Sequence, residues 1–500
     1  MAIRDLLQAG APARIAVRAS SSVCTYQELS LVVDNLCLSL DRMNLRRGDR
    51  IAMALPNGLE IIACFLAAAT VGTAAPLNPA YTREEFKFYL EDTRARALIV
   101  PATGADQARS AATDLGVLLI EASSDERGNV RLSANERLDA LPETATAEAA
   151  ANDQIALMLH TSGTTSRPKR VPLSHNNLLT SARNVANTYQ LSPADVSLCV
   201  MPLFHVHGLV ASTLATFATG GSVVVPAKFN PLSFWQTMRE HHVTWYSAVP
   251  TIHQVLITRA KRTRPAGAEQ LRFIRSCSAS LAPQLMSEME ETFGAPVLEA
   301  YGMTEAAHQM ASNPLPPLEH KPGSVGRGTE VEIAILDEAG NVLPPAATGE
   351  VSIKGKNVFS GYEGNPEANA ESFTNGWFRT GDQGTLDSDG YLTLVGRIKE
   401  LINRGGEKIS PREIDETLLR HPAVAEACCF GIPDRTYGEG VAAAVVLKDT
   451  ATEKDLIVHC RASLSDFKCP TTIYIMDAIP RTATGKIQRR NVAAAIAGRS

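Results

Sequence analysis

The first half of the chain alternates helix-like segments with short strand-like runs. Apolar residues recur with helical spacing over 26–43 and 60–72, and the runs 51–55, 97–100 and 117–122 are short and apolar. Such alternation is typical of parallel βαβ units, in which helices cover the faces of a sheet. We therefore expect an α/β fold.

A different pattern begins near residue 330. Apolar residues alternate with polar ones over 331–335 and 351–353, and clusters of Gly, Asp and Asn separate these runs, which predicts antiparallel strands. A charged segment over 396–415 then leads to a final hundred residues with helix and strand signals of their own. We expect a domain boundary near Lys399.

The composition excludes several classes of protein. The chain has 500 residues, of which 45% are hydrophobic, so it can bury more than one core. Its 48 Lys and Arg residues against 53 Asp and Glu give a net charge of -5, too balanced for nucleic-acid binding through a large positive field. The uncharged stretch 61–82 is interrupted by Gly72 and Pro76, which predicts a buried helix and strand and no membrane span. Nine cysteines without a CxxC or zinc-ligand spacing indicate a reducing, cytosolic compartment.

The segment 157–171 carries the most informative motif. An apolar run ends in a loop rich in Ser, Thr and Gly, followed by a lysine. Hydroxyl and backbone N–H groups of such a loop can surround phosphate oxygens, and the lysine adds positive charge. The GxxxxGK[ST] pattern of a Walker A loop is absent, and a Ser/Thr-rich surface turn is the alternative for this loop taken alone. The expected phosphate-binding residues are Thr161, Ser162, Gly163, Thr164, Thr165 and Lys169.

Four further segments follow in one order along the chain: YGMTEA at 301–306, WFRTGD at 377–382, GRIKELI at 396–402 and PRTATGKIQRR at 480–490. Together with the loop they resemble the motifs of the adenylate-forming superfamily of acyl-CoA synthetases, luciferases and adenylation domains. The resemblance covers essentially the whole chain. It implies an N-terminal domain over 1–396 with two βαβ-type sheet subdomains and a distorted antiparallel β subdomain, and a small mobile α+β domain over 401–500.

The resemblance implies a reaction in two steps. A carboxylate attacks the α-phosphate of ATP to give an acyl-adenylate and pyrophosphate, and the thiol of coenzyme A then attacks the adenylate. Negative charge grows on the phosphate in the first step, and a nearby cation stabilises it. Lys486 matches the family's catalytic lysine; the alternative is one more solvated lysine. Glu305 matches the residue that holds Mg2+ against the ATP phosphates, a hard oxygen ligand for a hard cation.

Other matches concern the nucleotide. Asp382 would accept hydrogen bonds from the ribose hydroxyls, and Arg397 would help to hold the ribose or a phosphate; an ordinary ion pair is the alternative for both. Tyr301 offers a flat face for stacking, with a core tyrosine as its alternative. The residues that the resemblance implies around the adenine and α-phosphate are Ser278, Ala279, Ser280, Glu299, Ala300, Tyr301, Gly302, Met303 and Thr304.

Residues 397–400 match the family's hinge, with Lys399 at its centre. A rotation about this hinge would remove Lys486 from the site after the first step. It would also bring Gly405 and Gly406 beside the thiol of coenzyme A, where a backbone without side chains can approach closely. A charged, solvated linker is the alternative interpretation.

Arg170 departs from the family pattern, because most relatives have glycine after the loop lysine. If this position required a positive φ, arginine would be strained at a cost on the order of 1 kcal/mol. Replacing Arg170 by glycine would then raise stability slightly. An added phosphate contact is the alternative role for this arginine.

The residues expected around the acid are polar. His205 matches the family's gating aromatic residue or histidine, and His207 is expected to point into the acid pocket with Ser278 and His308. Such donors suit a second carboxylate, whose burial without donors or positive charge would be costly. The smallest acid of this kind is oxalate. The segments LMLHTSGTTSRPK, MPLFHVHGL, FIRSCSASLAP and HQMASNPLPP also resemble those of plant and fungal oxalate–CoA ligases.

His205 and His207 have two other interpretations. They could be strand-end histidines that bond to backbone carbonyls, or metal ligands, although no carboxylate or cysteine cluster stands near them in sequence. Without the resemblance, the strand-end interpretation would be preferred.

We expect an ATP-, Mg2+- and CoA-dependent acid–CoA ligase that acts on oxalate. The alternatives are the same chemistry on malonate or on a short, fatty or aryl acid, a carrier-loading adenylation protein, and a nucleotide-binding module without catalysis. A non-catalytic module is expected to lose Lys486 or Glu305, and both are present. The expected partners are small molecules. The terminal residues Ala-Gly-Arg-Ser differ from a Ser-Lys-Leu type signal, so we expect the cytoplasm over the peroxisome.

Overall fold

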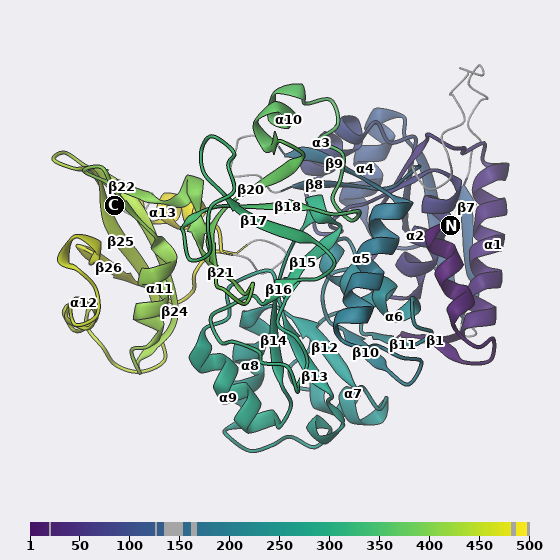
Figure 1. Ribbon diagram of the computed structural model, residues 1–500. Coiled ribbons are helices and arrows are strands. Elements are labelled where there is room, and N and C mark those ends of the chain that lie inside the picture. The colour runs from purple at the N-terminus through teal and green to yellow at the C-terminus, as the bar shows by residue number, and fades with distance from the viewer. Residues whose placement is uncertain (20–21, 126–127, 135–153, 162–167, 482–486, 498–500) are drawn as a thin grey trace.

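Four β-sheets make up the framework of the chain within its described residues (Figure 1). Two large sheets are mainly parallel, and two smaller, mainly antiparallel sheets follow later in the sequence. The computed structural model describes the chain outside six short stretches, residues 20–21, 126–127, 135–153, 162–167, 482–486 and 498–500.

The seven-stranded sheet and its helices comprise β3 (Arg50–Met53), β4 (Thr73–Pro76), β5 (Ala97–Pro101), β6 (Leu118–Ser124), β7 (Val130–Ala134), β8 (Ile155–Thr161), β9 (Lys169–Ser174), α1 (Tyr26–Arg42), α2 (Leu59–Val71), α3 (Arg83–Thr93) and α4 (Asp106–Leu115). The strand order is β7-β6-β5-β3-β4-β8-β9. Side chains alternate along β3, so that Ile51 and Met53 pack with α1 and α2 while Ala52 packs with α3 and α4. Both faces are therefore covered, as the predicted βαβ units require.

The nine-stranded sheet and its helices comprise β1 (Ile15–Ala19), β2 (Val23–Thr25), β10 (Val196–Cys199), β11 (Ser222–Val225), β12 (Trp245–Ala248), β13 (Phe273–Ser276), β14 (Val297–Met303), β15 (His308–Ser312), β16 (Arg327–Gly328), α5 (His175–Thr188), α6 (Ala215–Phe217), α7 (Phe234–Glu240), α8 (Pro250–Ala260), α9 (Pro283–Phe293) and the π-helix η2 (His207–Leu214). The strand order is β16-β15-β14-β13-β12-β10-β11-β1-β2. Tyr246 and Ile274 pack with α7, α8 and α9, whereas Trp245 and Phe273 pack with α5, η2 and α6 on the opposite face.

Local sequence signals fix where several of these helices begin. Thr25 caps α1 and Thr82 caps α3, and each threonine exchanges hydrogen bonds with a glutamate three residues later, Glu28 or Glu85. This capping box satisfies backbone N–H groups that the first helical turn leaves without partners. The 3-10 helices are η1 (Ile3–Ala9), η3 (Ala268–Gln270), η4 (Thr304–Ala306), η5 (Ile398–Glu400) and η6 (Asp466–Lys468).

The third sheet is antiparallel, as the alternating runs near residue 330 predict. It comprises β17 (Glu332–Leu336), β18 (Gly349–Lys354), β19 (Phe373–Thr374), β20 (Trp377–Leu386) and β21 (Leu392–Arg397), with α10 (Pro366–Ser372) before β19. The register shifts between Glu350 and Ser352 and again between Gln383 and Gly384, which distorts the sheet. The pairing of β20 with β21 places Asp382 opposite Arg397.

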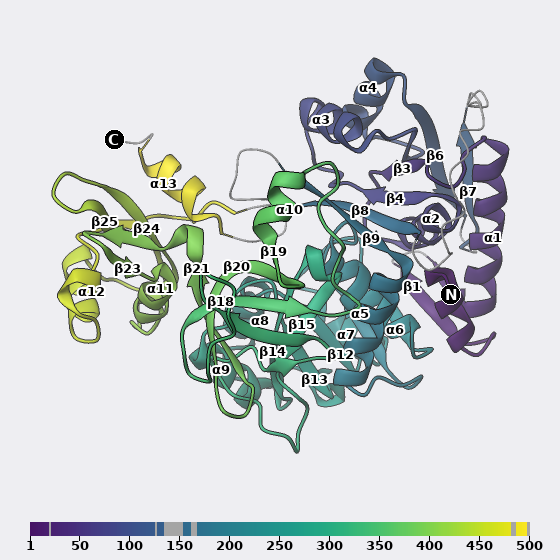
Figure 2. The same ribbon diagram turned by 45° about the horizontal axis from the view of Figure 1, so that its top comes forward.

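The fourth sheet forms a smaller unit at the C-terminal end. It comprises β22 (Ile402–Arg404), β23 (Glu407–Ile409), β24 (Val424–Asp434), β25 (Gly438–Leu447) and β26 (Thr472–Ile475), with α11 (Pro411–Leu419), α12 (Glu453–Arg461) and α13 (Arg489–Ala497). One face of the sheet packs with α11 and α12 around Cys429, and the other packs with α13 around Cys428. Figures 1 and 2 both show this unit at one side of the molecule, next to β20 and β21.

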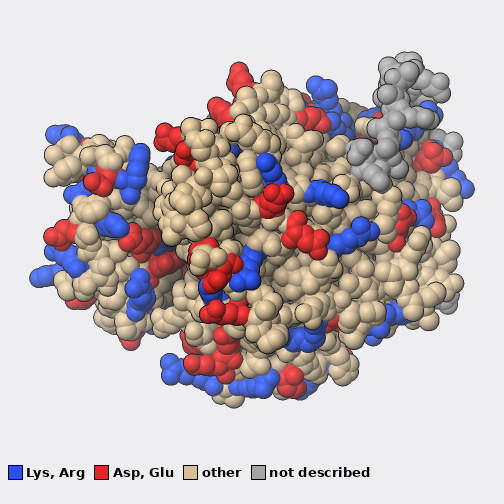
Figure 3. Space-filling view, viewed as in Figure 1, with Lys and Arg blue, Asp and Glu red and all other residues tan. Residues whose placement is uncertain are grey.

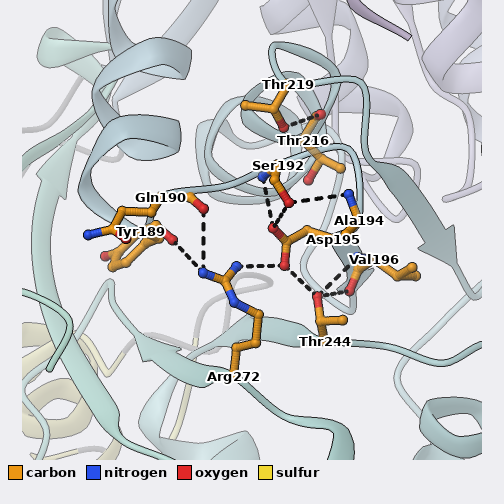
Figure 4. A network of polar contacts seen from close by, with 10 residues as sticks. All are labelled: Tyr189, Gln190, Ser192, Ala194, Asp195, Val196, Thr216, Thr219, Thr244 and Arg272. Atoms are coloured by element: carbon orange, nitrogen blue, oxygen red, sulfur yellow. Dashed lines mark hydrogen bonds and ion pairs between the residues drawn. The ribbon is translucent and has the colours of Figure 1, made fainter. Parts of the chain in front are cut away.

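A polar network joins the amino ends of β10, β12 and β13 (Figure 4). The buried carboxylate of Asp195 accepts hydrogen bonds from the Arg272 guanidinium at 2.6 Å, the Thr244 hydroxyl at 2.8 Å and the Ser192 backbone N–H at 2.8 Å. Arg272 also donates to the carbonyls of Tyr189 and Gln190. Charge and hydrogen bonds are thus balanced at this edge of the sheet.

Two surface properties bear on the functional classes considered. Among the described helices, none is long and apolar enough to span a bilayer. On the face drawn in Figure 3, basic and acidic residues are interspersed, without an extended patch of one sign.

Candidate active site

Two adjoining cavities lie at the carboxyl ends of β12, β13 and β14. The larger has a volume of about 1190 Å³ and lies between the C-terminal unit and the rest of the chain, and the smaller has about 450 Å³. Ligands of open α/β sheets bind outside the carboxyl ends of the strands. The residues that line both cavities are Ser278, Gly302, Arg397 and Lys399.

Asp382 and its neighbours form one wall of the larger cavity. The hydroxyl of Tyr301 on β14 donates to the Asp382 carboxylate, and the Arg397 guanidinium forms an ion pair with it at 3.1 Å. Burial raises the pKa of Tyr301 well above its ordinary value, so this residue stays a donor. The structure thus brings together three residues that lie far apart in sequence, next to Ala279, Ser280 and Ala300.

Glu299 lines the same cavity with a carboxyl group that is only half satisfied. Its Oε1 accepts the Leu281 backbone N–H at 2.9 Å, whereas Oε2 has no hydrogen-bond partner among the described residues. Burial raises the pKa of Glu299 to about 7, while the positive charge of Arg412 acts in the opposite direction. An incompletely satisfied buried carboxyl group is typical of a wall that contacts a ligand.

Glu305 lies on η4 at the wall of the smaller cavity, with Thr304, Met303 and Thr161. One of its oxygens accepts the Tyr362 hydroxyl at 2.8 Å. Burial raises the pKa of Glu305, and the Tyr362 hydrogen bond partly offsets this effect. Lys169, at the start of β9, sits 4.4 Å from the centre of the Tyr362 ring and lines the same cavity. A carboxylate and an ammonium group therefore border one space.

A buried polar cluster forms the end of the smaller cavity. The ring of His207 is fully buried, with Nδ1 3.0 Å from the Ser278 hydroxyl and Nε2 2.6 Å from the Ser247 hydroxyl. The His308 ring lies 5.2 Å from that of His207, and its Nδ1 is 3.3 Å from the guanidinium of Arg275. Both ring nitrogens of His207 face serine hydroxyls, whereas a strand-end histidine would be expected to face backbone carbonyls.

The members of this cluster do not all reach the cavity surface. Ser278, His205 and His308 line the smaller cavity, whereas His207 lies behind Ser278. His207 therefore does not point into the cavity as the sequence suggested. η2 begins at His207, and the His207 ring is directed at Ser247 on β12 and at Ser278 after β13. The ring therefore supports Ser278 from behind.

The backbone is strained at both ends of this polar wall. Ser278 has a φ of 74° and His308 a φ of 125°, values that side-chain-bearing residues rarely adopt. Gly302 makes room for the second of them, since a Cβ at this position would lie 2.3 Å from the His308 carbonyl oxygen. Strained residues persist where the surrounding structure holds them, and they cluster at functional sites.

The expectation of strain at Arg170 is wrong. Arg170 lies in β9 opposite His160, and its φ is not positive. Its guanidinium forms ion pairs with Asp92 and Glu363, both at 3.2 Å, and donates to the Asp92 carbonyl at 2.7 Å. These contacts join β9 to α3 and to Glu363, and the residue lies in an extended strand, where no positive φ is required.

Some expected site residues are not brought to the cavities. Gly405 and Gly406 form the turn between β22 and β23 and line neither cavity. Lys399 lies on η5 and lines both. Ser162, Gly163, Thr164, Thr165 and Lys486 lie outside the described residues.

The sequence did not single out several residues that hold the site together. Arg275 and Ser247 support the histidines, and Tyr362 holds Glu305. A charged residue within the strand-like run FIRS was the available signal for Arg275, because buried parallel strands are otherwise apolar. No sequence pattern distinguishes Tyr362 or Ser247 from ordinary core residues.

Comparisons with known proteins agree with this geometry. The family model for AMP-binding enzyme matches residues 7–363, and the model for its C-terminal domain matches residues 413–486. The chain is 49% identical to an oxalate–CoA ligase of Arabidopsis thaliana over 455 residues, which cover 90% of this chain and 88% of the relative. It is 46% identical to an oxalate–CoA ligase of Saccharomyces cerevisiae over an alignment of 504 positions, which covers 94% of this chain and 92% of the relative.

A solved structure shares the fold over the full length. ATP-bound MatB from Rhodopseudomonas palustris superposes with a TM-score of 0.88 at 29% identity, and the match covers 99% of both chains. The sheets, the two cavities and the matched motifs thus lead to one conclusion: the chain belongs to the AMP-binding enzyme family.

Proposed function

We propose that the chain is an ATP- and CoA-dependent acid–CoA ligase that converts oxalate to oxalyl-CoA through an acyl-adenylate. The observation that carries this proposal is the polar end of the 450 Å³ cavity, where Ser278 and His308 stand in front of the buried cation Arg275. An apolar acid would leave these donors without partners, whereas the second carboxylate of oxalate would accept from them. The curated oxalate–CoA ligases among the relatives support the same substrate.

In the first step, one carboxylate of the acid attacks the α-phosphate of ATP and pyrophosphate leaves. Lys169 borders the cavity where the phosphates would lie, and the loop residues Ser162 to Thr165 precede it in sequence. We assign Lys486 as the cation that stabilises charge at the attacked phosphate. Arg481 and Ile487, which flank the stretch 482–486, pair with each other and line the larger cavity.

The donor set around Glu305 fits Mg2+ bound together with ATP phosphates. Mg2+ takes one or two carboxylates and fills its other positions with water and phosphate oxygens. Glu305 is buried and lines the cavity. Because Tyr362 donates to one of its oxygens, the orientation of the carboxyl group, and with it of the second oxygen, is fixed. When bound there, Mg2+ would neutralise charge on the ATP phosphates.

The nucleoside would occupy the larger cavity. Asp382 would accept from the ribose hydroxyls, since Tyr301 and Arg397 hold its carboxylate in place. The turn residues Ala279 and Ser280 and the strand residues Glu299 and Ala300 would surround the adenine and α-phosphate.

In the second step, the thiol of coenzyme A attacks the adenylate and AMP leaves. We assign residues 1–396 and 401–500 as the two domains of the enzyme and 397–400 as the hinge between them. Rotation at Lys399 would exchange Lys486 for the turn Gly405–Gly406, which lines neither cavity in this conformation. His205, at the wall of the smaller cavity, is placed to gate the approach of the thiol.

The test is a panel of carboxylic acids assayed for pyrophosphate release with and without coenzyme A. Oxalate is expected to give the highest kcat/KM, and oxalyl-CoA is expected to form only when coenzyme A is present. The panel contains malonate, acetate, butyrate and an aryl acid as competitors, with a reaction lacking acid as the blank. Preference for a monocarboxylate would contradict the proposed substrate, and absence of AMP formation with every acid would contradict the proposed reaction.

A further inference from the structure

Arg275 is a fully buried cation surrounded by neutral partners. Its guanidinium lies 3.0 Å from the Tyr189 hydroxyl, 3.0 Å from Gln309 Oε1, 3.0 Å from the Ser247 hydroxyl and 3.3 Å from His308 Nδ1. Among the described residues, no carboxylate forms an ion pair with it. A buried charge without an opposite charge is costly, so its retention needs a reason.

The guanidinium fixes the direction of the hydrogen bond between Ser247 and His207. Arginine only donates, so the Ser247 oxygen accepts from Arg275. The Ser247 hydroxyl hydrogen then needs an acceptor, and His207 Nε2, at 2.6 Å, is the one within reach among the described residues. His207 therefore accepts at Nε2 and carries its own hydrogen at Nδ1.

The next hydrogen bond in this chain leads from His207 to Ser278 at the cavity wall. His207 Nδ1 donates to the Ser278 oxygen at 3.0 Å, so the Ser278 hydroxyl hydrogen is left to point elsewhere. Ser278 lines the cavity, and the described residues offer no acceptor for this hydroxyl. The hydrogen of Ser278 is thus available to an acceptor inside the cavity.

Arg275 also determines the form of His308. A hydrogen on His308 Nδ1 would face the guanidinium, which is itself a donor, at 3.3 Å. His308 Nδ1 is therefore the acceptor, and the ring carries its hydrogen on Nε2 in the neutral form. His308 lines the cavity, and its Nε2 lies 3.9 Å from the Sγ of the buried Cys277.

We propose that Arg275 is the positioning residue that sets acid specificity: it holds His207 and His308 neutral and, through Ser247 and His207, turns the hydroxyl hydrogen of Ser278 toward an anionic acid. This inference rests on the proposed function, because the acceptor inside the cavity is the second carboxylate of the acid. Arg275 also supplies the permanent positive charge behind these donors. Binding of the dianion is then independent of pH across the range in which free histidine titrates.

Other ionisable groups face the two rings. Cys277 Sγ lies 3.9 Å from His308 Nε2, and His205 Nδ1 accepts the His207 backbone N–H at 3.3 Å. Tyr189, the residue after α5, contacts Arg275, and Glu305 and Lys169 line the smaller cavity. Arg275 differs from these groups because it donates to both Ser247 and His308, so its removal is expected to change the hydrogen bonds of both histidines.

The experiment measures the KM for oxalate and for ATP at pH 6, 7 and 8 in the full-length enzyme. In the unmodified protein the oxalate KM is expected to stay within about twofold across this range. Arg275→Met, which has a similar shape but no charge or donor, is expected to raise the oxalate KM about 10- to 100-fold at pH 8. Lowering the pH to 6 is expected to recover several-fold, because the released histidines can then protonate. The ATP KM should follow neither change.

Two variants separate this role from a general structural one. Arg275→Lys keeps the charge and is expected to restore much of the oxalate KM. Arg272→Met removes the other arginine near this strand and is the matched control. It should lower the melting temperature, because Asp195 loses its ion pair, and leave the oxalate KM and its pH profile unchanged.

The inference is overturned by either of two results. One is an oxalate KM that falls more than about fivefold from pH 8 to pH 6 in the unmodified enzyme while the ATP KM stays constant. The other is a folded Arg275→Met variant whose oxalate KM equals that of the parent. If Arg275→Met does not fold, the pH profile of the parent and the Arg275→Lys variant decide. Failure of the proposed function would differ from both, since the parent would then not activate oxalate at any pH.

Discussion

Arg272 and Arg275 stand three residues apart at opposite ends of β13. Arg272, at the amino end, is neutralised by Asp195 at 2.6 Å, and every group around it has a partner inside the protein (Figure 4). Arg275, near the carboxyl end, meets hydroxyl, amide and imidazole groups. The charge at the amino end of β13 is neutralised within the protein, whereas the charge near the carboxyl end would be neutralised by a bound anion.

The backbone follows the same division. Ser278 and His308 hold positive φ angles next to the carboxyl ends of the strands, and the carboxyl group of Glu299 keeps one oxygen without a described partner. The amino-end network around Asp195 contains no residue with a positive φ other than Gln190. Stability and binding are thus separated along the strands, because a group that already has all its protein partners cannot also hold a ligand.

The largest effect is expected for Lys486, the cation that we assign to the first step of the reaction. Lys486→Ala should lower the rate of adenylate formation about 1,000-fold or more, since it removes a cation needed as the transition state forms. Thioester formation from supplied oxalyl-adenylate should survive, because Lys486 would have left the site by that step. The two half-reactions are measured separately by pyrophosphate release and by loss of free thiol. An equal loss in both would contradict the domain rotation.

A smaller loss is expected at the polar wall itself. His308→Leu removes a polar side chain that lines the cavity and should lower kcat/KM for oxalate roughly 30- to 1,000-fold. His207→Leu should act in the same direction through Ser278. Turnover of acetate or butyrate, if measurable, should change little. His253→Leu is the matched control, because His253 is equally buried but lines neither cavity. Oxalate turnover within a few-fold of the parent in both variants would refute the dicarboxylate pocket.

The incompletely hydrogen-bonded carboxyl group of Glu299 should make the free energy of unfolding depend on pH. Its pKa is raised from 4.5 to about 7, so the folded protein retains this proton longer than the unfolded chain and loses stability as the pH rises from about 4.5 to 7. Glu299→Gln should remove this loss, and its stability relative to the parent should rise by about 2.5 kcal/mol between pH 5 and pH 8.

Urea unfolding of the ligand-free protein at the two pH values measures this difference. The exposed Glu332→Gln is the control and should show no such trend. A pH-independent difference between Glu299→Gln and the parent would mean that the Glu299 carboxyl group is as well solvated as in the unfolded chain.

The smallest effect is expected at Arg170, which resembles Arg272 in being neutralised by carboxylates. Arg170→Gly should lower the free energy of unfolding by about 1–2 kcal/mol, because it removes two ion pairs and places glycine in a strand. The ATP KM should stay within about twofold of the parent. A large rise in that KM would show that Arg170 binds phosphate and belongs with the ligand-binding end.

The sequence predicted the elements of the fold because their signals are local. Period and flanking turns were sufficient for α1, α2 and β17–β18, and the uncharged stretch 61–82 became the buried α2 and β4, as expected. Arg170 was misjudged for the opposite reason. Its backbone conformation depends on the pairing of β9 with β8, a tertiary contact that the family pattern of glycine does not reveal.

The site was predictable only where its residues sit in compact motifs. Tyr301 and Glu305 share one short motif, and Asp382 and Arg397 lie in two others, so their proximity followed from the resemblance. Arg275 and Ser247 were not found, because each is one residue within a buried strand and acts through contacts with residues up to 86 positions away. For the same reason, His207 was expected on the cavity surface and lies behind it.

The π-helical form of η2 bears on how this pocket can change during evolution. A π-helix closes its hydrogen bonds one residue later than an α-helix, so it carries one extra residue. Deleting one residue from 209–214 would let the segment wind as an α-helix and turn His207 by about 100° relative to α6. The ring would then no longer meet Ser247 and Ser278. A one-residue deletion in η2 would therefore alter the polar wall without any substitution of the residues that form it.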